Sequence, residues 1–140
     1  MEFTIHTLET APEASKEALI HAKETFGIIP NLEGILAEAP AALKGGMALW
    51  DLFATSSLTP IEQQIVYLTA NYQHDCRYCM AAHSGLAKTI GMASEDIDAL
   101  RNGKPLADPK LQALRLFTQR TIETRGWVED REIEEFLAVG

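Results

Sequence analysis

Apolar residues recur along most of this chain with the spacing of an α-helix. After Pro60, for example, Ile61, Ile65, Leu68 and Tyr72 follow one another at intervals of three and four residues. This spacing places their side chains on one face of a helix. No segment alternates apolar and polar residues for long enough to predict a β-strand. The pattern therefore predicts an all-α fold, a helical bundle of about six to eight helices.

Capping residues, prolines and glycines set the expected limits of these helices. The clearest start is Thr59-Pro60 with Glu62, where Thr59 is an N-cap, Pro60 is the first helical residue and Glu62 completes a capping box. Asn31 and Ser94 are expected to cap two shorter helices, and glycines end several others. The expected helices cover residues 13–26, 32–39, 40–53, 60–72, 75–90, 94–101, 108–126 and 129–139.

The length of 140 residues suits one domain with a core of its own. No repeat, linker or low-complexity stretch divides the sequence. We therefore expect a single domain over residues 1–140. It would consist of N-terminal helices (12–55), a core that holds both cysteines (58–91) and C-terminal helices (94–139).

The charge of the chain limits its partners. Twelve basic and 20 acidic residues give a formal net charge of −8. Nucleic-acid backbones and anionic membranes both require a basic face, so neither is an expected partner. No apolar stretch approaches the length of a membrane span, and residues 1–6 lack the basic segment and apolar core of a secretory signal. We expect a location in the cytoplasm.

The two cysteines of the chain, Cys76 and Cys79, are three residues apart. On a helix this spacing puts both sulfurs on one face, and His83, four residues after Cys79, returns to that face. In the cytoplasm such a pair is more often redox-active or metal-binding than a structural disulfide. Cys76 lies at the predicted helix start, where the helix dipole favours a thiolate. The pair can then cycle between dithiol and disulfide while His83 transfers protons.

Three other interpretations of these residues stay open. His83 can be a hydrogen-bonded core histidine. The cysteines can be half of a zinc site with His74 and His83, although no second cysteine pair exists to complete the usual ligand set. They can also be two inert, buried thiols.

The residues around this pair closely resemble one family. Residues 58–66, which include the Leu-Thr-Pro helix start, and residues 76–84, which run from Cys-x-x-Cys to Ala-Ala-His-Ser, are similar to the carboxymuconolactone decarboxylase family in its alkylhydroperoxidase D (AhpD)-like branch. Weaker similarity covers most of the chain from Gly27 onward. The branch with decarboxylase activity lacks the cysteine pair, so ring decarboxylation is not expected.

The resemblance implies an all-helical, AhpD-like bundle that assembles into dimers, trimers or hexamers. It also implies a peroxidase or disulfide reductase with no bound cofactor, which takes electrons from an external dithiol such as a lipoyl-bearing protein. By position, Cys76 and Cys79 are the redox pair, and His83 belongs to a proton relay.

Two positions depart from the family pattern. Gln64 stands where the relay commonly has a glutamate, and a neutral amide cannot take up a proton. Gln64 is therefore expected to orient a water or substrate by hydrogen bonds; Tyr67 and Asn71 share its helix face. Tyr78 stands where some relatives have a second histidine.

The leading prediction is an antioxidant thiol oxidoreductase that reduces hydroperoxides or disulfides. Cys76, Cys79 and His83 would be its catalytic residues, and Gln64 and Tyr78 would support them. The alternative, which Gln64 and Tyr78 motivate, is a redox-sensing or scaffolding oligomer with little peroxidase turnover.

Overall fold

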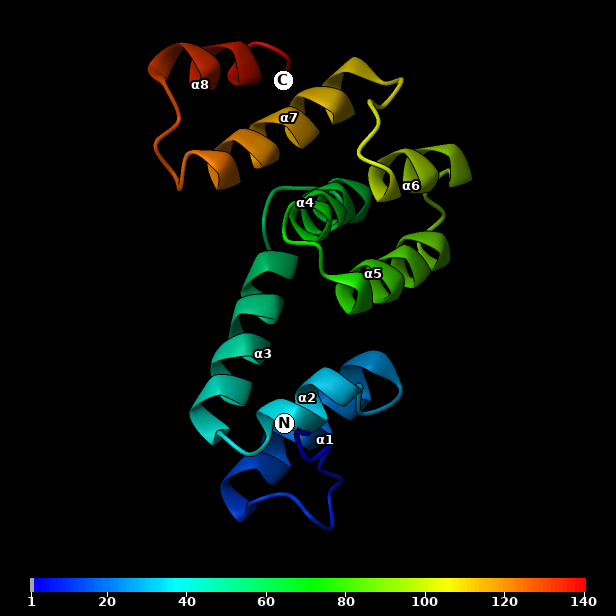
Figure 1. Ribbon diagram of the computed structural model, residues 1–140, viewed down its shortest axis with the longest axis vertical. Coiled ribbons are helices and arrows are strands. Elements are labelled where there is room, and N and C mark those ends of the chain that lie inside the picture. The colour runs from blue at the N-terminus through cyan, green and yellow to red at the C-terminus, as the bar shows by residue number, and fades with distance from the viewer. Residues whose placement is uncertain (1) are drawn as a thin grey trace. The chain divides into compact units, whose positions relative to one another are not determined.

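The computed structural model describes residues 2–140, and over this range the chain forms eight α-helices and no strand (Figure 1). The all-α prediction and the expected number of helices are confirmed. The helices are α1 (Glu13–Phe26), α2 (Asn31–Leu36), α3 (Pro40–Ala54), α4 (Pro60–Gln73), α5 (Arg77–Thr89), α6 (Ser94–Arg101), α7 (Pro109–Glu123) and α8 (Asp130–Leu137).

The helix starts with the strongest sequence signals form as expected. Thr59 Oγ1 accepts the N–H of Glu62 at 3.3 Å, and Glu62 Oε2 accepts the N–H of Thr59 at 2.7 Å, so the capping box of α4 is present. Asp108 caps α7 by accepting the N–H groups of Lys110 and Leu111 at 2.9 and 3.0 Å.

Other helix ends differ from the sequence prediction by one or a few residues. Asn31 and Ser94 are the first helical residues and not N-caps, because Pro30 and Ala93 hold the extended N-cap conformation. Helix α2 stops at Leu36, before a turn that leads into Pro40. Helix α7 stops at Glu123 and does not reach Gly126, because Arg125 already has a φ of +56°.

The chain forms two compact units, the first ending at Ser56 and the second running from Ser57 to Gly140. In the first unit, α1, α2 and α3 pack on one another. Its buried core consists of Ala11, Ala18, Leu19, Ala22, Ala37, Leu43 and Met47. The expectation of one domain over residues 1–140 stays a prediction.

Helix α4 is the centre of the second unit. It packs against α5, α6 and α7, while α8 packs against α7 (Figure 1). Ile65 and Leu68 of its apolar stripe are fully buried, whereas Tyr72 at the end of the stripe is 44 % exposed. The buried core around them consists of Ile65, Leu68, Ala87, Met92, Ile97, Leu100, Leu106 and Leu114. This packing fixes the direction in which the chain leaves α4 and enters α5.

The loop after α6 depends on a glycine. Gly103 has a φ of +65°, and a methyl group placed on it would lie 2.7 Å from Cε1 of Tyr72 and nearer still to Cζ and the hydroxyl oxygen of that side chain. The carbonyl oxygen of Gly103 also accepts a hydrogen bond from Nη2 of the buried Arg115 at 2.8 Å. No side chain fits here without moving Tyr72 or the loop.

We therefore expect Gly103→Ala to lower the free energy of unfolding by about 1–3 kcal/mol, from backbone strain and the displaced tyrosine. Gly85→Ala is the matched control. Gly85 lies within α5 with open space around the position of a Cβ, so this change should stabilise by about 0.5–1 kcal/mol. Urea unfolding of the parent and both variants measures the two effects, and equal midpoints for the two variants would contradict the prediction.

Candidate functional site

The site begins at the tight connection between α4 and α5. His74 follows α4, and Asp75 takes a φ of +50°, a conformation that aspartate tolerates better than most residues. The N–H of Cys76 donates to the carbonyl oxygen of Asn71 at 3.0 Å, which holds the turn closed. Cys76 is therefore the N-cap of α5, and the helix itself begins at Arg77, two residues after the expected start at residue 75.

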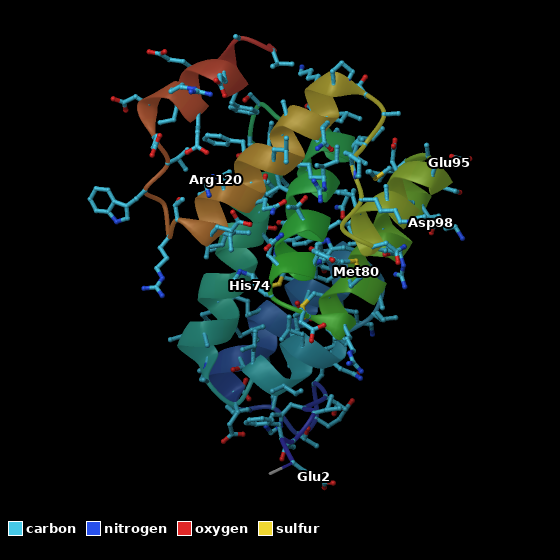
Figure 2. The ribbon with its side chains drawn as sticks, turned by 45° about the horizontal axis from the view of Figure 1, so that its top comes forward. Glu2, His74, Met80, Glu95, Asp98 and Arg120 are labelled. Carbon is cyan, nitrogen blue, oxygen red and sulfur yellow. A yellow bond between two sulfur atoms is a disulfide. The ribbon has the colours of Figure 1, made fainter. Side chains whose placement is uncertain are left out.

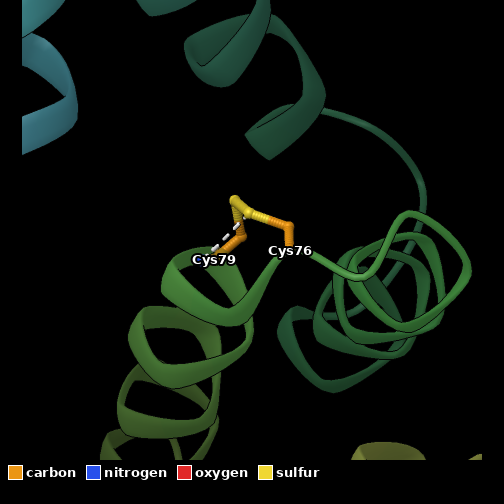
Figure 3. Close-up of a disulfide and its surroundings, with 2 residues drawn as sticks. All are labelled: Cys76 and Cys79. Atoms are coloured by element: carbon orange, nitrogen blue, oxygen red, sulfur yellow. Dashed lines mark hydrogen bonds between the residues drawn. A yellow bond between two sulfur atoms is a disulfide. The ribbon is translucent and has the colours of Figure 1, made fainter. Parts of the chain in front are cut away.

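Cys76 and Cys79 form a disulfide at this end of α5 (Figure 3). Their Cα atoms are 5.3 Å apart, because an N-cap and the third helical residue lie within one turn. The Sγ of Cys76 also accepts the backbone N–H of Cys79 at 3.3 Å. Both residues are partly exposed, so the cysteines are not the buried pair that one alternative required.

Metal binding was another alternative. Among residues 2–140, no three or more histidine, cysteine, aspartate or glutamate side chains come together in a way that could hold a metal ion. His74, one of the two histidines considered as zinc ligands, is exposed on the turn after α4 (Figure 2). The part of the chain that the structure describes therefore offers no ligand set for a zinc site.

His83 lies on α5 one turn after Cys79 and contacts α4. Its Nδ1 is 2.9 Å from Oε1 of Gln64, whose side chain is buried with 8 % exposed. An amide oxygen only accepts hydrogen bonds, so Nδ1 of the neutral imidazole carries the proton and Nε2 carries the lone pair. His83 is thus a hydrogen-bonded histidine held in one tautomer, with its proton-accepting nitrogen on the far side of the ring from Gln64.

Tyr67 holds the same imidazole from another side. The rings of Tyr67 and His83 are stacked, with centroids 4.3 Å apart and an angle of 25° between their planes. Tyr67 follows Gln64 by three residues on α4, so one helix face supplies both contacts. Sequence reasoning placed Tyr67 on this face but missed the stacking, which depends on how α4 and α5 pack.

Burial makes this group of residues electrically neutral. Desolvation lowers the pKa of His83 from 6.5 to about 4, and it raises the pKa of Tyr67. Near pH 7 the histidine is therefore an uncharged base, next to an uncharged amide and an uncharged phenol.

Tyr78, the other predicted supporting residue, lies between the cysteines with 46 % of its surface exposed. Thus α5 carries Tyr78, Cys79 and His83, with Cys76 as its N-cap, and α4 contributes Gln64. The functional roles expected for these residues stay predictions.

Comparison with known proteins agrees with this architecture. The model of the carboxymuconolactone decarboxylase family matches residues 38–119, more than half of the chain. The chain belongs to the carboxymuconolactone decarboxylase family. The matched range includes the cysteine pair, Gln64 and His83, and the resemblance seen in the sequence is confirmed.

Two solved structures share the fold of this family member. One is a peroxidase-related protein from Silicibacter sp. TM1040, with 18% sequence identity and a TM-score of 0.79; the alignment covers 100% of this chain and 77% of that one. The other is a peroxidase-related protein from Ralstonia eutropha JMP134, described as an alkylhydroperoxidase AhpD core. It has 18% identity and a TM-score of 0.84, with 99% of this chain and 75% of that chain covered.

A search of curated proteins found no match. Within the described range, none of the helices has both the length and the apolar character that crossing a bilayer requires.

The lowered pKa of His83 predicts how stability changes with pH. Between pH 6.5 and about 4 the unfolded chain binds more protons at this position than the folded protein, so the folded state loses stability as the pH falls. His83→Asn removes this titration and keeps an N–H donor near Gln64. We expect the parent to lose more stability than His83→Asn between pH 7 and pH 4.

Thermal unfolding of the oxidised proteins at several pH values measures this difference, and NMR titration of the ring gives the pKa directly. His74→Asn, which changes an exposed histidine near the same site, is the control and should follow the parent. Parallel curves for the parent and His83→Asn, with a ring pKa near 6.5, would refute the prediction.

Proposed function

We propose that this member of the carboxymuconolactone decarboxylase family is a thiol-dependent oxidoreductase that reduces hydroperoxides or disulfides. Its redox centre would be the pair Cys76–Cys79. The observation that carries the proposal is the disulfide between these cysteines at the start of α5, on a helix that also carries a neutral imidazole one turn beyond Cys79.

In the reduced protein, one cysteine attacks as its thiolate. The N-cap position favours this form at Cys76, because the N–H of Cys79 and the positive end of α5 both stabilise negative charge on its sulfur. Attack on a hydroperoxide breaks the O–O bond, leaving a sulfenic acid on the protein and releasing an alcohol. The second thiol then displaces water and restores the disulfide.

Attack on a disulfide follows the same course with sulfur in place of oxygen. A mixed disulfide forms first, and the second cysteine resolves it. In both reactions two electrons leave the protein, and the two thiol protons end on the products. His83 would carry these protons through Nε2, while Gln64 and Tyr67 keep its ring in place.

An external dithiol would return the protein to its reduced state. A lipoyl-bearing protein is the class of donor that we propose, with no cofactor bound to the chain itself. We propose that Tyr78, which is 46 % exposed between the cysteines, would contact such a partner. We further propose a homo-oligomer and a location in the cytoplasm, where reduced thiols are maintained.

The neutral histidine–amide pair favours one second candidate. A site without a charged proton relay suits a redox sensor or scaffold whose thiols change state but turn over little. Steady-state turnover distinguishes the two candidates. An enzyme consumes many equivalents of substrate per site, whereas a sensor stops after one.

Cys76→Ser and Cys79→Ser test the proposal. We expect each variant to lose turnover of hydroperoxide or disulfide, in the presence of a dithiol reductant, by at least about 100-fold, because neither can re-form the internal disulfide. Serine is a favourable N-cap and accepts the same backbone N–H, so Cys76→Ser should leave α5 intact. Circular dichroism checks this. Equal turnover in the parent and both variants would rule out the mechanism.

A further inference from the structure

We infer that the exposed face of α3 binds the same face of a second copy of this chain, with the two helices antiparallel. The inference gives the proposed homo-oligomer an interface and does not depend on the proposed chemistry of the cysteines. It follows from the residues of this face, from the order of large and small side chains along it and from its charge.

The two sides of α3 differ in what covers them. One side packs on α1 and α2 (Figure 1), and Leu43 and Met47 on this side belong to the buried core. The other side is exposed and holds only small or apolar residues: Ala41, Ala42, Gly45, Gly46, Ala48, Leu49 and Leu52.

This exposed face is broad and continuous. Successive residues of a helix are about 100° apart, so its residues cover an arc of about 160°. Leu49 and Leu52 are 71 % and 68 % exposed. A contiguous apolar surface of this kind is typical of a site that another protein covers.

The two glycines of the face have no role within a single chain. A glycine inside a helix is less favourable than an alanine. Neither Gly45 nor Gly46 has a positive φ, and no described atom outside their own stretch of helix lies within 4 Å of the position of a Cβ on either. Glycine does allow a second helix to approach closely, because no side chain then separates the two backbones.

Large and small residues follow one another along this face in an order that fits its own copy. A seam of residues at intervals of three, four and three runs along it: Ala42, Gly45, Leu49 and Leu52. Such intervals are typical of two helices that pair along their length.

The antiparallel direction matches the sizes of these side chains. When two copies of α3 cross at the level of residue 47, Leu52 faces Ala42 of the second copy and Leu49 faces Gly45 of the second copy. Every layer of the seam then joins a large residue to a small one. Parallel copies in register would place each leucine against the same leucine. The antiparallel seam is thus self-complementary, as a twofold axis requires.

Charge favours the same partner and direction. The net charge of −8 makes a second copy repulsive over most of its surface, whereas the exposed face of α3 carries no charge. The charged residues of α3 are Lys44 and Asp51, and Asp51 also pairs with His21 of its own chain at 2.8 Å. Antiparallel pairing brings Lys44 to the level of Asp51 of the second copy, so opposite charges lie level with each other.

The size of the interface sets the expected affinity. One pair of helices forms an interface below the roughly 1,200 Å² at which specific complexes become stable. We therefore expect a reversible dimer with a Kd on the order of 10 µM.

Sedimentation velocity at about 1–200 µM, with a reductant present to exclude disulfides between chains, tests the inference. We expect Ala42→Leu to raise the Kd at least about tenfold, because it sets a leucine against Leu52 of the second copy. Adding Leu52→Ala restores a large–small pair and should return the Kd to within about threefold of the parent.

Ala42→Leu combined with Leu49→Ala is the matched control. It has the same amino-acid composition as the first double variant, but it leaves leucine against leucine at the changed layer. We expect its Kd to stay at least about tenfold above that of the parent. A face that binds only because it is apolar would not distinguish the two double variants.

The outcomes separate this inference from the proposed function. A parent that stays monomeric at about 200 µM overturns the inference and the homo-oligomer, and leaves the thiol oxidoreductase standing, since turnover tests that separately. An oligomer that Ala42→Leu does not weaken, or two double variants that behave alike, overturns the inference and leaves the homo-oligomer standing.

Circular dichroism checks that the variants fold, and NMR of the parent needs no variant. Dilution from about 200 to about 5 µM should shift the amide signals of α3 and leave those of α8, which carries the exposed Leu137, unchanged. Shifts that spare α3 would overturn the inference even if a variant failed to fold.

Discussion

The hydrogen bond between Oε1 of Gln64 and Nδ1 of His83 joins α4 to α5 and orients the imidazole beside the cysteine-bearing end of α5. Gln64 is buried and His83 is largely desolvated, so loss of either partner would leave a polar group of the other unsatisfied, at a cost of about 1–3 kcal/mol. The bond selects one tautomer of the imidazole. Because its acceptor is an amide, it does so without adding charge.

The position of the disulfide depends on a different local feature, the turn between α4 and α5. Asp75 in a left-handed conformation and the bond from Cys76 N–H to Asn71 put Cys76 at the N-cap of α5. Backbone N–H groups at a helix start lack helical acceptors, and here one of them meets sulfur. In the proposed reaction the backbone would stabilise the thiolate, while the imidazole of His83 and the amide of Gln64 carry no charge.

Most of the secondary structure was predictable because its signals are local. Thr59, Pro60 and Glu62 make a capping box in whichever fold follows, and Asp108 with Pro109 starts α7 in the same way. The predicted helix ends were wrong where a neighbouring residue prevented the expected residue from ending or capping the helix. Pro30 took the N-cap position expected of Asn31, and the positive φ of Arg125 prevented α7 from reaching Gly126. The end of α4 shows the same limit, since Tyr72 continues the apolar stripe but lies half-exposed beside Gly103.

By itself the sequence determined the all-α class, the family and the placement of two cysteines and a histidine on one helix, because spacing along a helix is a property of the chain alone. It also showed that residue 64 is a glutamine, so that this position carries a neutral amide and not the carboxylate common in the family. Only the tertiary structure decided that this amide meets Nδ1 of His83, that Tyr67 stacks on the same ring and that burial keeps the imidazole uncharged. These features depend on how α4 packs against α5, and such packing brings together residues that are far apart in the chain.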